Sequence, residues 1–262
     1  MREDKQRIAL VFSAGGLFGA YQAGVWAALS ELGWRPDLVV GASIGSLNGW
    51  AVAGGCAAEE LADRWRSVGE AMTPRWRMPR SIWDGVVDSE PVYELISGVH
   101  REFQPVIDYG LVVTELPRPR PRLITTPDIE QDHLIASCAI PGFYRQPRLD
   151  GRILSDGGLL CPVPLWAAAE MGATHIIAVN AVPNWPWYFT AVTRSCGQAV
   201  VNRLAPPELP TVIIAPEDGL GTRRDTVVWN RDNIERWLEQ GFEDGRRALP
   251  NLHVLLEEVR SY

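Results

Sequence analysis

The stretch DLVVGASIGSLNG, residues 37–49, places a serine between two glycines directly after an apolar run. The run Leu38–Val40 predicts a buried strand, and the residues that follow the second glycine predict a helix. A G-x-S-x-G turn between a strand and a helix holds a hydroxyl group on a tight, strained corner at the edge of a sheet. Gly41 and Gly45 allow the neighbouring backbone to come close. The stretch therefore predicts an α/β fold with Ser43 as a candidate nucleophile.

The same unit occurs nearer the N-terminus. The run Ile8–Phe12 predicts a buried strand that opens into the glycine loop Ser13–Gly16. Residues Gly19–Leu32 then carry apolar side chains at helical spacing, and Gly33 is suited to end that helix. Two strand-loop-helix units in succession predict a parallel sheet with right-handed crossover connections.

The rest of the chain continues this alternation. Further strands are expected at Tyr109–Thr114, Arg122–Thr126, His175–Val179 and Thr211–Ala215, with a hairpin about Asp150-Gly151. Further helices are expected at Ala57–Ser67, Ile129–Ser137 and Val163–Met171, and in a C-terminal segment with Ile234, Trp237, Leu238 and Phe242 on its apolar face. Thr73–Asp88 is expected to be a loop or a short-helix excursion, and the prolines between 117 and 121 favour an extended linker. We expect one domain over residues 1–262.

Composition narrows the class of protein. The 262 residues are 46% hydrophobic and 22% charged, which is typical of a soluble globular chain. The net charge of -7 argues against a nucleic-acid partner, because such binding needs a dominant basic field. The N-terminal residues lack the pattern of a signal peptide or a spanning helix. We expect a cytoplasmic protein, with a peripheral position at a membrane as an alternative.

Cysteine and histidine are too dispersed for a metal site. The four cysteines contain no C-x-x-C pair, which favours a reducing compartment and buried thiols. The four histidines form no H-x-H or H-x-x-x-H cluster. No metal and no other cofactor is expected, and the oligomeric state is left open.

A serine hydroxyl needs a base within hydrogen-bond distance before it can act as a nucleophile. His175 falls inside an apolar strand and His253 in the segment NLHVLLEE, so neither has the loop context of a catalytic histidine. Asp156 ends a predicted strand and precedes two glycines, which favours it over the other aspartates in Asp-Gly pairs. Those others, expected to be ordinary turn formers, are Asp84, Asp150, Asp218 and Asp244.

The first glycine loop is a candidate oxyanion hole. Residues 14–17, AGGL, open directly into a helix, where backbone amides are available to a developing negative charge. A phosphate-binding loop is the competing interpretation. The sequence lacks both the G-x-x-x-x-G-K-[ST] and the G-x-G-x-x-G patterns.

Three segments taken together resemble the patatin-like phospholipase family: SAGGLFGAYQAG at 13–24, GASIG at 41–45 and DGG at 156–158. ASCAIPGF at 136–143 and residues 172–180 extend the resemblance in the same order and spacing. Residues 211–249 fit the family less specifically.

The resemblance implies a three-layer α/β/α fold with a central, mostly parallel sheet and a Ser-Asp catalytic dyad without histidine. It implies that Ser43 is the nucleophile, Asp156 the base, and the amides of Gly15 and Gly16 the oxyanion hole. The glycines expected to support the site are Gly41, Gly45, Gly157 and Gly158. The family hydrolyses acyl esters of lipids through an acyl-enzyme intermediate. The alternatives are an acyltransferase with the same intermediate and a catalytically silent lipid-binding module.

Two residues depart from the family pattern. Ala14 replaces the first of three glycines, and Phe18 stands where a basic residue is common. Ala14 should leave the loop amides in place. Phe18 removes a positive charge beside the glycine loop, so the family's preference for phosphate-bearing substrates over neutral esters is not carried over to this chain.

Tryptophan is abundant, with 11 in the chain. Trp76 and Trp83 lie among arginines in an aperiodic stretch, and a second aromatic cluster comprises Trp185, Trp187, Tyr188 and Phe189. Both clusters suit a membrane interface or the rim of an acyl pocket, and both also suit the packing of loops on the core. Trp26, Trp166 and Trp237 fall on helices and are expected in the core.

Overall fold

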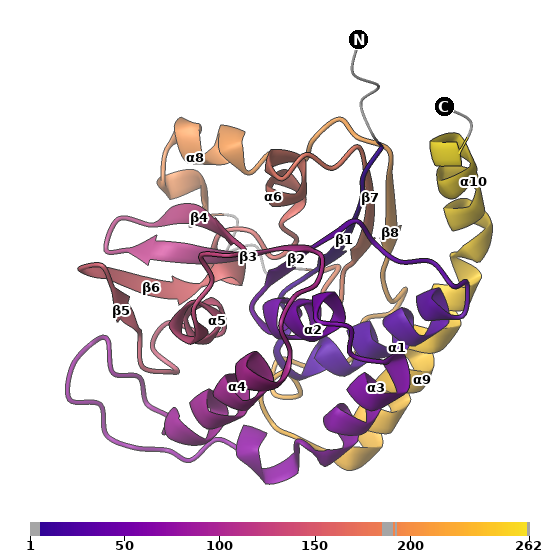
Figure 1. Ribbon diagram of the computed structural model, residues 1–262. Helices are drawn as coiled ribbons and strands as arrows, with labels where there is room; N and C mark the ends of the chain where they lie inside the picture. The colour runs from indigo at the N-terminus through magenta and orange to yellow at the C-terminus, as the bar shows by residue number, and fades with distance from the viewer. Residues whose placement is uncertain (1–5, 185–190, 192, 261–262) are drawn as a thin grey trace.

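The computed structural model describes residues 6–184, 191 and 193–260. Its centre is an eight-stranded sheet in the order β5-β6-β3-β2-β1-β7-β8, with β4 paired to β3 (Figure 1). The strands are β1 Ile8–Phe12, β2 Leu38–Ala42, β3 Asp108–Leu116, β4 Arg120–Thr125, β5 Arg148–Leu149, β6 Arg152–Asp156, β7 His175–Val179 and β8 Thr211–Ile214. Strands β3, β2, β1, β7 and β8 run parallel, while β4, β5 and β6 pair antiparallel.

Helices cover both faces of this sheet, which confirms the predicted fold class (Figure 1). On one face lie α1 to α5 and α9, and on the other lies α6. The helices are α1 Gly19–Ser30, α2 Ile44–Ala53, α3 Ala58–Ser67, α4 Glu90–Glu102, α5 Gln131–Ser137, α6 Leu165–Glu170, α8 Gln198–Arg203, α9 Arg231–Arg247 and α10 Leu249–Arg260. Short 3-10 turns occupy Gly16–Phe18, Gly69–Met72 and Gly157–Leu159.

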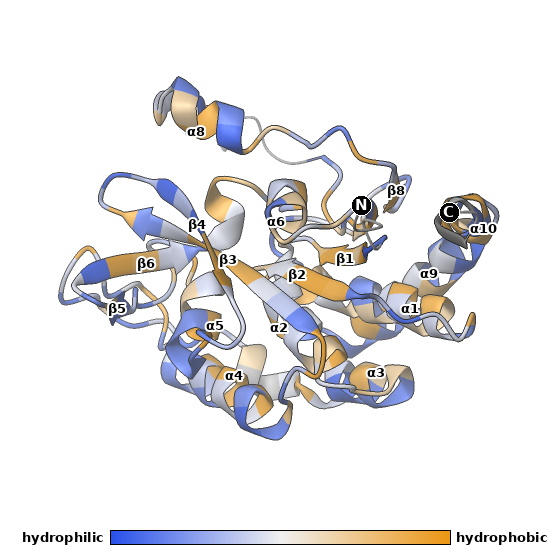
Figure 2. Ribbon diagram, turned by 45° about the horizontal axis from the view of Figure 1, so that its top comes forward, coloured by the Kyte–Doolittle hydropathy of each residue, from blue (hydrophilic) through white to orange (hydrophobic). Residues whose placement is uncertain are grey.

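Strand β1 shows how the two apolar layers divide. Leu10 and Phe12 belong to the larger core under α1, α2 and α9, whereas Ala9 and Val11 belong to the smaller core against α6. Because both faces of the central strands are buried, these strands are apolar at every position, and Figure 2 shows β1 and β2 as apolar bands. Continuous apolar runs are what made these strands predictable from sequence.

Helices α1 and α9 pack with almost no space between their backbones. A Cβ atom at Gly24 would lie 2.1 Å from the carbonyl oxygen of Leu238, and one at Gly241 would lie 2.1 Å from that of Tyr21. Asp244, expected to be a turn former, instead lies buried in α9 and accepts a hydrogen bond of 2.9 Å from the Tyr21 hydroxyl. The expectation for Asp244 was wrong because helix pairing overrides the local turn preference of an Asp-Gly pair.

Other differences from the sequence expectations are local. The prolines after β3 form a tight turn at 117–119 rather than an extended linker, since β4 begins at Arg120, opposite Glu115. Pro121 is tolerated because β4 pairs only with β3 among the described strands. The sequence analysis also missed α4, α8 and α10, although Ser89 and the following proline are start signals for α4.

The thiols and tryptophans follow the expectations in part. Cys56 is buried as expected, but Cys138, Cys161 and Cys196 are only half-buried. The expected core tryptophans Trp26, Trp166 and Trp237 are all buried. The cluster of Trp185, Trp187, Tyr188 and Phe189 lies outside the described residues.

Candidate active site

Strand β3 brings two distant segments of the chain together. Its first half pairs in parallel with β2, as far as Val112 opposite Ala42. Its second half pairs antiparallel with β6, beginning at Val113 opposite Asp156. Strands β6 and β2 therefore end at the same place in the sheet. Asp156, the last residue of β6, lies next to Ser43, which follows Ala42.

Ser43 sits on the sharp turn that the G-x-S-x-G motif predicts. Its backbone has φ 53° and ψ -128°, a conformation that is strained for a residue with a side chain. A Cβ atom at Gly41 would lie 2.3 Å from the carbonyl oxygen of Gly45, and one at Gly45 would lie 2.4 Å from that of Ser13. Both glycines are therefore needed, because backbone segments pass where side chains would begin.

The side chains of Ser43 and Asp156 are hydrogen-bonded to each other. Ser43 Oγ donates to Asp156 Oδ2 at 2.6 Å, and the Gly158 amide donates to Oδ1 at 2.7 Å. Asp156 is 5% exposed and Ser43 is 6% exposed. The carboxylate is thus held in a fixed orientation away from bulk water, with one oxygen directed at the hydroxyl.

Burial raises the pKa of Asp156 to about 7, against the partial lowering by hydrogen bonds from Ser43 and Gly158. Burial removes water from the carboxylate and so disfavours its charged form. No cation among the described residues pairs with the carboxylate to offset this cost. A carboxyl group with this pKa can both accept and return a proton near neutral pH.

The first glycine loop lies against the same cleft. Gly15 and Gly16 line the cleft together with Ser43 and Asp156. Within the described part of the chain, the amides of these two glycines donate to no protein acceptor, whereas the Leu17 amide donates to the carbonyl oxygen of Thr226 at 2.9 Å. Two backbone donors without an acceptor among the described residues therefore belong to residues that line the cleft of Ser43.

The two departures from the family pattern have structural reasons. Ala14 is buried, and its methyl group lies only 2.5 Å from where a Cβ atom at residue 158 would stand, so Gly158 makes room for it. Phe18 is buried and packs edge-on against Trp237, with ring centroids 4.9 Å apart. Phe18 is therefore a core residue between α1 and α9 and contributes no charge to the cleft.

Ser137, which was not predicted from the sequence, holds the turn of Ser43 in place. Its hydroxyl donates to the carbonyl oxygen of Val112 at 2.8 Å and accepts from the Ser43 amide at 3.1 Å. Ser137 thereby links the turn after β2 to strand β3. The available signal was a lone polar residue in the otherwise apolar stretch LIASCAI, within the segment that carried the family resemblance.

A second polar network, which was not predicted from the sequence, holds the glycine loop Ser13–Gly16. The Gln22 side-chain amide donates to the Ser13 carbonyl oxygen at 2.6 Å, and Asn48 donates to Gln22 Oε1 at 2.9 Å. The Ser13 hydroxyl accepts from the Ala181 amide at 2.9 Å. These buried contacts link α1, α2 and the end of β7 to the loop that carries Gly15 and Gly16.

The histidines lie elsewhere. His175 is buried on β7, where its Nδ1 lies 2.9 Å from the Thr174 hydroxyl, and His253 is exposed on α10. No described histidine hydrogen-bonds to Ser43 or Asp156. Among residues 6–184, 191 and 193–260, no group of three or more metal-ligating side chains comes together, and no helix is long and apolar enough to cross a membrane.

Three neighbouring cavities share lining residues near Ser43. The first is an apolar cleft of about 270 Å³ that holds Ser43, Asp156 and the glycine loop. A neck of about 40 Å³, lined by Leu47, Met72 and Leu95, shares Ser43 with that cleft. The same three side chains also line a second apolar pocket of about 310 Å³ between α2, α3 and α4. Ser43 thus lines both the cleft and the neck, and the neck shares three lining residues with the second apolar pocket.

Comparison with known proteins adds to this geometry. A family model described as patatin-like phospholipase matches residues 10–169. An uncharacterized NTE family protein of Mycobacterium tuberculosis is 30% identical over 178 residues, which cover 66% of this chain and 49% of that protein. Patatin-like phospholipase domain-containing protein 6 of Mus musculus is 31% identical over 189 residues, which cover 66% of this chain and 13% of that protein. The chain spans half or less of the length of these relatives.

A solved structure resembles the fold over nearly the whole chain. VipD from Legionella pneumophila superposes with a TM-score of 0.56 at 14% identity, covering 94% of this chain and 67% of that one. The family match covers more than half of the sequence and contains both Ser43 and Asp156. This chain belongs to the patatin-like phospholipase family.

Proposed function

We propose that the protein is a lipid acyl hydrolase that cleaves carboxylic esters through a Ser43–Asp156 dyad and an acyl-enzyme intermediate. The observation that carries the proposal is the 2.6 Å hydrogen bond from Ser43 Oγ to Asp156 Oδ2 inside an apolar cleft. Family membership supports lipid substrates. The single sheet, which includes strands from Ile8 to Ile214, supports one catalytic domain.

In the proposed first step, Ser43 Oγ attacks the ester carbonyl carbon while Asp156 takes the hydroxyl proton. The carbonyl oxygen becomes an oxyanion, which the amides of Gly15 and Gly16 stabilise by hydrogen bonds. Collapse of this intermediate breaks the bond to the alcohol oxygen. The alcohol leaves with the proton from Asp156, and Ser43 remains acylated.

In the second step, water attacks the acyl-enzyme and Asp156 accepts one of its protons. Collapse then releases the fatty acid, and the proton returns to Ser43 Oγ. The elevated pKa of Asp156, about 7, suits a group that takes and returns a proton in each half of the cycle.

The apolar compartments support a substrate with a hydrocarbon chain. We propose that the acyl chain passes the neck at Leu47, Met72 and Leu95 and enters the pocket between α2, α3 and α4, while the alcohol portion faces the open cleft. Phe18 brings no charge to the glycine loop, although Arg223 lines the cleft, so we propose that phosphate-bearing substrates are not preferred over neutral esters at a membrane surface. Comparing hydrolysis of a phosphatidylcholine with that of a neutral monoester tests this preference, and a strong phospholipid preference counts against it.

The experiment that tests the mechanism is hydrolysis of a short-chain p-nitrophenyl ester by the wild type, Ser43→Ala and Asp156→Ala. Each variant should lose about a thousandfold or more in kcat/KM. A His175→Ala/His253→Ala double variant is the matched control and should retain activity. Activity in either dyad variant would refute the dyad, and loss in the control would restore a histidine mechanism. Product analysis with an added alcohol acceptor separates hydrolysis from acyl transfer.

A further inference from the structure

Exposed apolar side chains gather in the segment Thr73–Val86, which connects α3 to α4. Trp76 is 72% exposed, Met78 is 88% exposed and Ile82 is 80% exposed. The other large, exposed apolar side chains of the described residues, Val106, Ile213 and Val254, are scattered over the chain. We call these three side chains, which lie within seven residues of sequence, the patch; exposed apolar side chains concentrated in one segment mark a candidate interaction site.

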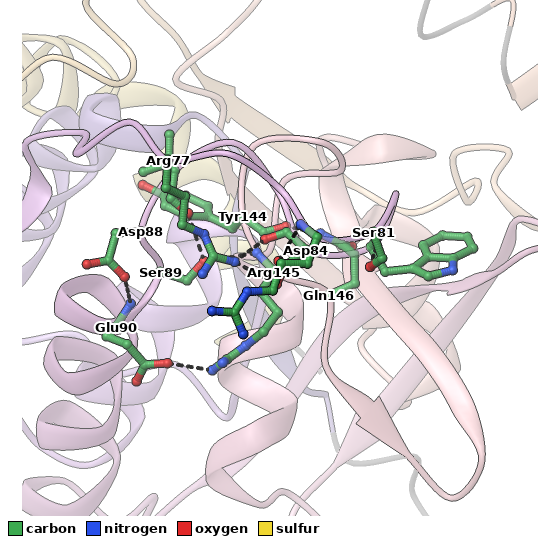
Figure 3. A network of polar contacts seen from close by, with 12 residues as sticks. Arg77, Ser81, Asp84, Asp88, Ser89, Glu90, Tyr144, Arg145 and Gln146 are labelled. Carbon is green, nitrogen blue, oxygen red and sulfur yellow. Dashed lines mark hydrogen bonds and ion pairs between the residues drawn. The ribbon is translucent and has the colours of Figure 1, made fainter.

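Hydrogen bonds hold the segment Thr73–Val86, which carries the patch. The Arg77 guanidinium donates to the Asp84 backbone oxygen at 2.7 Å and to Oδ1 at 2.6 Å, and the Arg80 amide donates to the other carboxylate oxygen at 2.9 Å (Figure 3). Backbone bonds tie the segment to its neighbour, from Val86 to Gly142 at 3.1 Å and from Gln146 to Trp83 at 2.7 Å. The segment is therefore held in place while its apolar side chains face outward.

Contacts with Phe143 also place the segment Thr73–Val86 beside the cleft of Ser43. The Trp76 ring packs edge-on against the Phe143 ring, with centroids 5.9 Å apart, and Phe143 lines the cleft. The Val87 amide donates to the carbonyl oxygen of Phe143 at 3.0 Å. A surface that contacted the patch would therefore lie beside the cleft.

The charge of the segment is opposite to that of the chain. Thr73–Val86 contains three arginines and one aspartate, whereas the whole protein carries a net charge of -7. Arg77 is paired with Asp84, but Arg75 and Arg80 are exposed and form no ion pair within the described part of the chain. Exposed apolar side chains beside arginines match a membrane surface with anionic headgroups.

We propose that Trp76, Met78 and Ile82 insert into the interface of an anionic lipid bilayer, with Arg75 and Arg80 at the level of the headgroups. This inference rests on the proposed function, because it explains how a cleft for acyl esters would be presented to lipid. Binding uses the patch residues only and requires no chemistry at Ser43.

The test measures co-sedimentation of the full chain with vesicles, in a Ser43→Ala background so that hydrolysis cannot alter the lipid. Vesicles of phosphatidylcholine alone are compared with an equimolar mixture of phosphatidylcholine and phosphatidylglycerol. The Trp76→Ser/Met78→Ser/Ile82→Ser variant should partition about a hundredfold or more weakly into both. Arg75→Gln/Arg80→Gln should lose only the added affinity for the anionic mixture, and that added affinity should fall with salt.

The control carries Val106→Ser and Ile213→Ser, which remove exposed apolar side chains elsewhere, and it should bind as the parent does. Equal binding of the patch variant and this control would overturn the proposal. A patch variant that binds as the parent does but changes a dimer into a monomer would also overturn it, in favour of an interface between copies. Hydrolysis of a soluble p-nitrophenyl ester, measured with Ser43 intact, is read separately. Absence of that activity alongside normal vesicle binding refutes the proposed function and leaves the patch standing.

Discussion

Replacing Asp156 by asparagine separates the role of the carboxylate in the proposed chemistry from its effect on stability. Asparagine has the same shape, can accept the hydrogen bond from the Gly158 amide, and can donate to Ser43 Oγ. It cannot take a proton from the hydroxyl. We therefore expect Asp156→Asn to abolish ester hydrolysis and, at alkaline pH, to increase the free energy of unfolding.

The magnitude follows from the pKa of Asp156, which rises from 3.8 in its ordinary state to about 7 in the folded protein. A raised pKa means that the folded state holds its proton more tightly than the unfolded state. The resulting stability is fully present below pH 3.8 and is lost as the pH rises through 7. The full loss is about 4 kcal/mol, of which about 3 kcal/mol falls between pH 5 and pH 8.

Urea unfolding of the wild type and Asp156→Asn, followed by tryptophan fluorescence at pH 5 and pH 8, measures this loss. The difference between the two proteins isolates residue 156, because the other titrating groups are common to both. The advantage of Asp156→Asn should be about 3 kcal/mol larger at pH 8 than at pH 5, which corresponds to roughly 5–10 °C in Tm. Ser43→Ala, which keeps the carboxylate but removes a hydrogen bond that lowers its pKa, serves as the control and should lose at least as much stability between pH 5 and pH 8 as the wild type.

Two results would refute the reasoning. If the stability difference between Asp156→Asn and the wild type is the same at pH 5 and pH 8, then burial does not raise the pKa of Asp156. If Asp156→Asn is the less stable protein at pH 8, then the carboxylate is charged and well stabilised by its hydrogen bonds. In either case the site would not be poised to exchange protons near neutral pH.

Three further outcomes are expected. For the wild type, kcat/KM on a soluble ester should fall as the pH drops below about 7, because protonated Asp156 cannot accept the Ser43 proton; a profile that is flat down to pH 5 would exclude it as the base. Gly24→Ala should cost about 3 kcal/mol of stability, since its Cβ atom would lie 2.1 Å from a backbone oxygen of α9, whereas Gly98→Ala, with nothing within 4 Å, should gain about 0.5–1 kcal/mol in chemical denaturation. Val99→Trp, which fills the pocket between α2, α3 and α4, should lower the ratio of kcat/KM for long-chain over short-chain esters about tenfold; an unchanged ratio would move the acyl chain elsewhere.

The strands and the serine turn could be predicted from sequence because their signals are local. A strand buried on both faces is apolar at each position, and a turn with a positive φ at Ser43 needs the small residues Gly41 and Gly45 around it. The helix α4 was within reach of the same reasoning. The error at Asp244 arose because a partner distant in sequence, Tyr21, decided the conformation. The error at the prolines after β3 arose because strand pairing between β3 and β4 overrides the extended preference of proline.

The choice of Asp156 as the partner of Ser43 shows where local signals end. Sequence alone offered several aspartates before glycine, and resemblance to a family selected one. In the structure the selection comes from register, because β3 exchanges β2 for β6 between Val112 and Val113. A shift of β6 by one residue would turn the carboxylate to the other face of the sheet. No property of the DGG segment itself encodes that register.

Ala14 makes the same point about the motifs themselves. From the sequence alone, Ala14 is only a departure from the three glycines that the family usually has in this loop. In the structure its methyl group occupies the space left by the missing side chain of Gly158, whose amide holds the carboxylate of Asp156. The oxyanion loop and the aspartate loop are therefore packed against each other, and substitutions in one are constrained by the other. Motifs that are separate in sequence act here as one steric unit, so their residues have to be interpreted in pairs.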